Sequence, residues 1–86
     1  MADETNEMLK GFRDRTGLSQ KELARLMGLG LSAYQDLESG FSKFKDRHML
    51  ALERVSLRLA VEREDLNIAF PSMRRDALDF AKLTTG

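Results

Sequence analysis

The chain of 86 residues has no cysteine and no tryptophan, and it has only one histidine, His48, and one proline, Pro71. Without cysteine it can form no disulfide, no thiol nucleophile and no cysteine-ligated zinc site, so packing must stabilise the fold. One histidine gives no basis for a metal site or a Ser/His/Asp set, and no glycine-rich loop for a phosphate is present. The sequence therefore predicts neither an enzyme nor a protein with a metal or cofactor.

Long apolar runs are absent as well, and the first residues are acidic, whereas a secretory leader begins with basic and then apolar residues. These absences predict a cytoplasmic protein with no membrane partner. The length and an apolar content of 42% allow one small domain over residues 1–86, with a modest core and no deep pocket. No small-molecule effector is evident from the sequence.

A helix start signal is present at residues 18–23, Leu-Ser-Gln-Lys-Glu-Leu. Ser19 can cap the free amides of a helix, and Glu22 can reach back to the Ser19 amide, which together form a capping box. Leu18 and Leu23 are spaced as a hydrophobic staple. The next apolar residues give an inward stripe at helical spacing, made of Leu23, Leu26 and Met27. A helix is therefore expected from Ser19 to Gly28, where glycine permits a sharp turn.

A second short helix is expected at residues 31–39, between Gly30 and Gly40. Its spacing places Tyr34, Leu37 and Glu38 on the buried side, with the Tyr34 hydroxyl reaching the surface. The outward side then consists of Leu31, Ser32, Gln35, Asp36 and Ser39. Two helices joined by a tight turn over residues 19–39 form a helix-turn-helix, a unit that presents its second helix to the DNA major groove.

Residues 18–40 resemble the helix-turn-helix of the phage repressor and Cro-like family, also called XRE-like, without a gap in spacing. The resemblance rests on the Leu-Ser-Gln-Lys-Glu-Leu-Ala-Arg-Leu-Met-Gly run and the Leu-Glu-Ser-Gly ending. A wider five-helix pattern covers about residues 5–70. The resemblance implies an all-α, repressor-like DNA-binding domain, here with an additional C-terminal helix at about residues 72–83.

The resemblance also implies which residues meet DNA. Residues expected at phosphates are Gln20, which also braces the recognition helix, and the basic residues after that helix, Lys43, Lys45 and Arg47. Residues expected at base edges are Leu31, Ser32, Gln35 and Asp36. A glutamine can pair with adenine, a leucine can contact a thymine methyl group, and an aspartate can accept from cytosine or pair with a nearby basic residue. Leu31 stands where relatives often carry a base-reading glutamine, so it can instead belong to a protein interface.

The rest of the chain predicts a scaffold of further helices. The pattern indicates a helix at about residues 5–15, another from a cap at Asp46 to about Val61, and a last one capped by Ser72. Phe41 and Phe44 are expected to clamp the basic loop onto the helix pair, and His48 to have a capping or surface role. The last helix has an apolar face, composed of Met73, Ala77, Phe80 and Ala81, which can pack back onto the domain or meet its own copy in a homodimer.

The charge is balanced overall but not along the chain. The formal net charge is zero, whereas residues 41–63 carry six Lys/Arg against three Asp/Glu. A basic segment next to a recognition helix favours a double-stranded DNA partner. The sequence thus predicts a sequence-specific transcriptional regulator; the alternative is a protein-interaction module of the same fold, antitoxin-like or adaptor-like, which the zero net charge favours.

Overall fold

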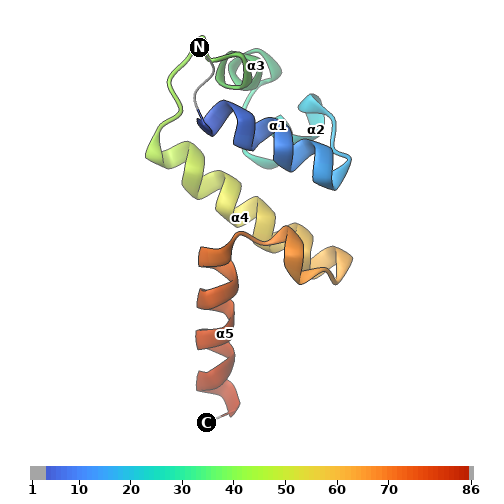
Figure 1. Cartoon of the computed structure of the whole chain (residues 1–86), viewed down its shortest axis with the longest axis vertical. Helices are drawn as coiled ribbons and strands as arrows, with labels where there is room; N and C mark the ends of the chain where they lie inside the picture. Colours follow the sequence, from blue (N-terminus) through green and yellow to red (C-terminus); the bar gives the residue numbers. More distant parts are fainter. Residues whose placement is uncertain (1–3, 86) are drawn as a thin grey trace. The chain divides into compact units, whose positions relative to one another are not determined.

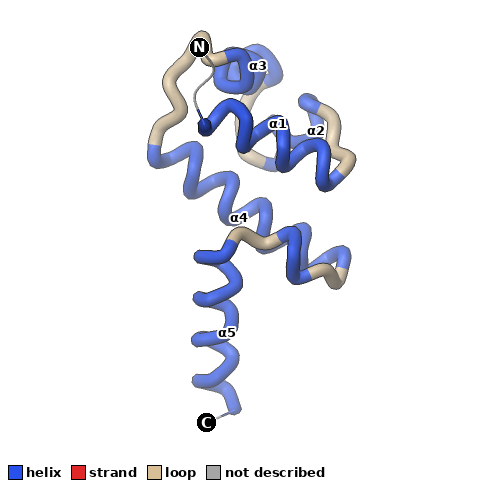
Figure 2. Tube along the Cα trace, in the orientation of Figure 1, coloured by secondary structure: helices blue, strands red, loops and turns tan. Residues whose placement is uncertain are grey.

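The computed structural model describes residues 4–85, and all regular structure in that range is helical, as the sequence predicts (Figures 1 and 2). The helices are α1 (Glu4–Thr16), α2 (Gln20–Leu26), α3 (Leu31–Ser39), α4 (Asp46–Arg63), a 3-10 turn (Leu66–Ile68) and α5 (Pro71–Thr85). The chain divides into an N-terminal unit up to Ala51 and a C-terminal unit from Leu52, so α4 contributes to both.

The predicted capping box starts α2. The Ser19 hydroxyl accepts a hydrogen bond from the Glu22 amide at 3.1 Å, and the Glu22 carboxylate accepts one from the Ser19 amide, also at 3.1 Å. Leu18 and Leu23 are both buried, as a hydrophobic staple requires. These contacts satisfy backbone donors that the first turn of a helix otherwise leaves open, so a helix of only seven residues has a defined beginning.

Two glycines with left-handed backbone bound the second half of the motif. Gly28 (φ 76°) lets the chain leave α2, and Gly40 (φ 87°) ends α3. Glycine is favoured at position 40 for a second reason, because a Cβ atom there would lie 2.6 Å from the side-chain nitrogen of the buried Asn6. The start of α1 therefore lies close to the end of α3, and any other residue at position 40 would have to displace the Asn6 amide.

The core of the N-terminal unit lies where α3 packs against α1 and α2, and both helices lie next to α3 in Figure 1. Its buried apolar side chains are Leu9, Phe12, Leu18, Leu23, Ala24, Met27, Tyr34 and Leu37. The prediction of an inward Leu26 is wrong, since this side chain is 40% exposed. Ala24 is buried instead of Leu26, because the side of the short helix α2 that faces the core is formed by residues 23, 24 and 27.

Ser56 connects two segments of the C-terminal unit. Its hydroxyl donates to the Glu53 carbonyl at 2.7 Å and accepts from the Phe70 amide at 3.2 Å, which attaches the segment before α5 to α4. The prediction that Ser72 caps the last helix is wrong: α5 begins at Pro71, and the Ser72 hydroxyl donates to the Glu53 carboxylate. Proline is favourable at a first helical position because it has no amide to satisfy.

A pair of leucine substitutions tests the register of α2. Leu23→Ala should lower the free energy of unfolding by about 2–5 kcal/mol, because it leaves a cavity at a fully buried position. Leu26→Ala, a matched change at the exposed neighbour, should change it by about 0.5 kcal/mol or less. Urea denaturation followed by circular dichroism measures both. Equal losses in the two variants would contradict this register.

Candidate nucleic-acid interface

The outward face of α3 forms the candidate reading surface. Ser32 and Gln35 are exposed, Leu31 is 41% exposed, and Asp36 is half-buried, so all four residues predicted at base edges have surface to offer. This face carries no basic residue, and its only charge is that of Asp36. Any attraction to phosphates must therefore come from neighbouring elements.

A buried carboxylate holds α3 against α1. Glu38, which is 4% exposed, receives two hydrogen bonds from the Arg13 guanidinium, from Nη2 at 2.7 Å and from Nε at 2.9 Å. The Tyr34 hydroxyl donates to the same carboxylate from one turn earlier in α3. Tyr34 is fully buried, so the prediction that its hydroxyl reaches the surface is wrong: the hydroxyl finds its partner inside.

Sequence reasoning missed Arg13, which lies 25 residues before Glu38 and outside the motif. A usable signal was present, because an acidic residue on the buried side of a helix needs a cation or several donors. Which cation supplies it depends on how α1 crosses α3, and that crossing follows from tertiary packing.

Gln20 lies between the buried carboxylate and the exposed face. Its side-chain nitrogen donates to Glu38 Oε1 at 3.1 Å, and its side-chain oxygen accepts from Gln35 Nε2 at 3.2 Å. The first residue of α2 is thereby joined to α3 at two points, so it braces that helix as the resemblance implies. Its expected contact with a phosphate stays a prediction.

Protonation of this cluster follows from its hydrogen bonds. Burial alone raises the pKa of Glu38, but the hydrogen bonds from Arg13, Tyr34 and Gln20 outweigh it, and the pKa lies below its usual value of 4.5. Burial raises the pKa of Tyr34 the most, and the hydrogen bond to Glu38 raises this pKa further. At neutral pH the carboxylate is therefore charged and the phenol is a neutral donor.

The segment after α3 supplies the positive charge. Lys43 and Lys45 in the loop and Arg47 in the first turn of α4 are all exposed, and they line one groove together with Asp36. Within residues 4–85, Asp36 makes no ion pair, so the predicted alternative of pairing with a basic neighbour is not realised in this structure. The Ser42 amide donates to the Asp36 carbonyl at 3.0 Å, which ties the loop to α3.

His48 caps α4, the helix that follows this loop. Its Nδ1 atom accepts a hydrogen bond from the Lys45 amide at 2.9 Å. The centroids of the His48 and Phe44 rings lie 5.6 Å apart, and the two rings are tilted relative to each other.

Two predictions for this segment are wrong. The helix starts at Asp46 itself, so Asp46 is not its cap. Phe41 does not clamp the loop either, because it is 83% exposed.

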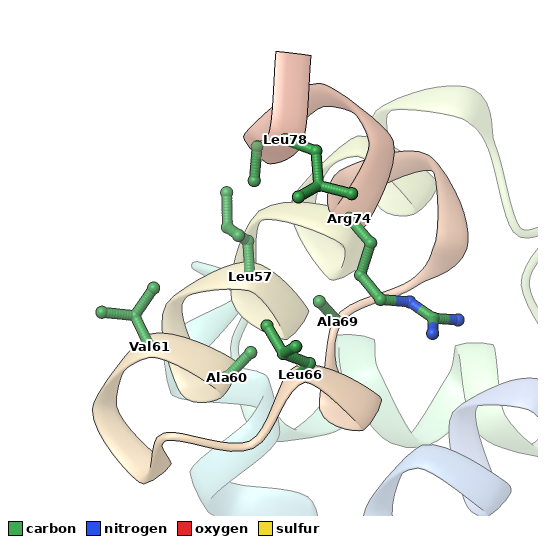
Figure 3. A pocket seen from close by; sticks show the side chains of 8 residues that line it. Leu57, Ala60, Val61, Leu66, Ala69, Arg74 and Leu78 are labelled. Atoms are coloured by element: carbon green, nitrogen blue, oxygen red, sulfur yellow. The ribbon is translucent and has the colours of Figure 1, made fainter. Parts of the chain in front are cut away.

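A hollow in the C-terminal unit is apolar and distinct from the candidate reading surface. Figure 3 shows Leu57, Val61, Leu66 and Leu78 around it, with the stem of Arg74 at one side. Further along α4 and α5, a second groove is lined in part by Ala77 and Phe80. Such surfaces suit apolar contacts with another helix and carry no group that would do chemistry.

Two helices joined by a glycine turn, with the second helix packed on the first and its outer face uncovered, define a helix-turn-helix protein. The family model described as helix-turn-helix matches residues 9–55, more than half of the chain. The protein belongs to this family in its repressor and Cro-like (XRE-like) form, a family of DNA-binding regulators.

No curated protein and no solved structure matches the chain significantly. In the part that the structure describes, no helix is long and apolar enough to cross a membrane. Across residues 4–85 there is also no group of three His, Cys, Asp or Glu side chains that could hold a metal ion.

His48 should make stability depend on pH. Burial lowers the pKa of His48 below 6.5, helped by Arg47 and Lys45, and protonation would remove the acceptor at Nδ1. The unfolded chain then binds the proton more readily than the folded one, so this contribution is complete above about pH 6.5 and is lost as the pH falls through the lowered value.

The melting temperature should therefore fall as the pH is lowered from 7.5 to 5, and it should stop falling below the pKa of His48 in the folded protein. NMR titration can measure this pKa directly, because the chain has only one histidine. His48→Gln keeps an acceptor that does not titrate, and it should flatten the curve. An unchanged slope in that variant would contradict the role assigned to His48.

Proposed function

We propose that this protein is a transcriptional regulator that recognises double-stranded DNA sequence-specifically by placing α3 in the major groove. The observation that carries the proposal is an uncovered α3 face, held rigidly by Glu38 and Gln20, beside an exposed basic loop. A rigid reading face and flanking cations are the two parts that sequence-specific binding needs.

The expected contacts divide into positioning and reading. Gln20, Lys43, Lys45 and Arg47 would contact phosphates, and Leu31, Ser32, Gln35 and Asp36 would meet base edges. Asp36 favours cytosine N4 as its base partner because no cation neutralises it within residues 4–85. Leu31 lies next to the polar residues expected at base edges, and its side chain suits a thymine methyl group.

A second candidate function is a protein-interaction module with little DNA affinity. The exposure of Leu31 (41%) and Phe41 (83%), together with zero net charge, favours it. Protein–DNA interfaces are more polar and more positively charged than protein–protein interfaces, so exposed apolar residues at the start of α3 and in the loop after it suit a protein partner. The two functions differ in how binding to a duplex depends on salt.

Selection from a random duplex library, followed by titration of the selected site at several salt concentrations, tests the proposal. We expect a consensus, and Lys43→Ala should weaken binding to all duplexes and lower the salt slope by about 1. Ser32→Ala should alter the preferred sequence, and Lys82→Ala on α5 serves as the exposed lysine control. Absence of any enriched sequence would refute the proposal in favour of a protein partner.

We further propose that two copies associate through α5. Every residue from Arg75 to Leu83 is exposed, and the stretch includes Leu78, Phe80 and Leu83 at 63–80% exposure. A single helix with so little packing is only marginally stable in water, so a covering partner would stabilise it. A symmetric dimer would give two reading helices for a two-fold symmetric site.

The absence of cysteine makes this association simple to test by cross-linking. Ala77→Cys lies on the apolar face beside both grooves, and it should give a covalent dimer under mild oxidation. Arg75→Cys is also exposed but lies roughly 160° around the helix from position 77, so it should cross-link far less. Equal yields, or a monomer by sedimentation at micromolar concentration, would contradict the dimer.

A further inference from the structure

The hollow in the C-terminal unit has a volume of about 230 Å³ and walls that are almost wholly apolar. Two small side chains, Ala60 and Ala69, are buried there. The larger side chains around them are 63–77% exposed: Val61, Leu66 and Leu78. Apolar side chains gathered at an open hollow are a surface that a ligand can cover. We propose that this hollow binds a small aliphatic carboxylate, whose tail lies among these side chains and whose charge pairs with Arg74.

Arg74 brings to this hollow a positive charge that the chain leaves unpaired. Figure 3 shows its side chain along one side of the hollow, with the guanidinium at the edge. Its Nε atom is shielded from solvent and has no hydrogen-bond partner in the part that the structure describes. No ion pair within residues 4–85 involves this arginine. A guanidinium is permanently charged, so an anion at the edge of the hollow would supply the acceptor that this donor lacks.

A carboxylate matches this arginine in shape and in charge. A guanidinium can donate two parallel hydrogen bonds to one carboxylate, as Arg13 does to Glu38 through Nε and Nη2. Arg74 is only half-buried, so a small turn of its side chain would present Nε to a ligand. It is also the only charged residue among the described ones that line the hollow. A headgroup with one negative charge is therefore neutralised there, whereas a phosphate with two charges is not.

The walls of the hollow determine the tail of the ligand. Apart from Arg74, every described lining residue is alanine, valine or leucine, so a polar tail would find no side-chain hydrogen-bond partner. An engineered cavity of about 150 Å³ holds benzene, and in the same proportion a volume of about 230 Å³ has room for roughly nine or ten non-hydrogen atoms. Octanoate has this size. Its tail would remove apolar surface from water at Leu66 and Leu78, which favours binding.

This ligand site does not depend on DNA recognition, because the hollow belongs to the C-terminal unit and the reading face of α3 to the N-terminal unit. It does concern the proposed pairing of α5, because Ala77 and Leu78 line the hollow and belong to the exposed stretch of that helix. A bound carboxylate and a second copy would compete for these two residues. Sedimentation of the same samples separates the two proposals, since a monomer at every concentration refutes the pairing and leaves the binding measurement valid.

Titration with octanoate, followed by NMR of the methyl groups, tests the inference on the unmodified protein. The methyl signals expected to shift and saturate at millimolar octanoate are those of Leu57, Val61, Leu66 and Leu78. The signals of Leu31 on the reading face should stay in place. Octanol has the same tail without the charge, so it should bind about tenfold more weakly. Equal affinities for the two ligands would overturn the inference, and so would shifts spread over the methyl groups of both units.

Substitutions at two successive arginines of α5 test the role of Arg74. Arg74→Gln keeps a polar side chain but removes the charge, so it should weaken octanoate binding about tenfold and leave octanol binding unchanged. Arg75→Gln is the matched control, because Arg75 is exposed and is not among the lining residues, and it should change neither affinity. Wild-type affinity for octanoate in Arg74→Gln would refute the inference. Circular dichroism checks the fold of both variants, and if Arg74→Gln does not fold, the comparison with octanol on the unmodified protein decides.

Discussion

The geometry of the N-terminal unit depends on one buried negative charge. Removing a carboxylate from water costs several kcal/mol unless it is paired and its remaining lone pairs are satisfied. Glu38 is stabilised only where α1 brings Arg13, α2 brings Gln20 and α3 brings Tyr34 to the same place. Three helices are thus held in one arrangement by the requirements of a single side chain, in addition to the apolar core. An apolar residue at position 38 would pack without specifying this arrangement.

The motif was predictable from the sequence because its signals are local. Ser19 and Glu22 interact within one helical turn. Gly28 and Gly40 adopt a left-handed backbone that depends only on the turn in which each stands. Both signals could therefore be inferred without knowledge of the fold. The errors arose where the outcome depends on distant segments. The exposure of Leu26 depends on how a seven-residue helix rotates against its neighbours, and periodicity alone leaves that rotation open by one position.

The residues of the candidate site were predictable from the sequence, but the hydrogen bonds that join them were not. The residues expected at DNA follow from their positions in the motif, and in the structure they are exposed except for Gln20 and Asp36, which are half-buried. The contact between Gln35 and Gln20 spans 15 residues, and the contact between Arg13 and Glu38 spans 25, so neither follows from helical spacing. A buried acid in the pattern indicates that donors must exist, and only the packed fold identifies them.

Zero net charge is compatible with DNA binding, because attraction to a phosphate depends on the charges near the binding surface and not only on their sum over the chain. Glu38 is neutralised by Arg13 inside the unit, which leaves Asp36 as the single acid on the reading face. The segment that follows carries Lys43, Lys45 and Arg47 against the exposed Asp46. Basic side chains therefore outnumber acidic ones next to the reading face, although the whole chain is neutral. Attraction confined to one loop also falls off within a Debye length of about 8 Å at physiological salt. Affinity would then depend strongly on close fit at base edges, and this requirement is consistent with a reading helix whose glutamine is held in place before DNA arrives.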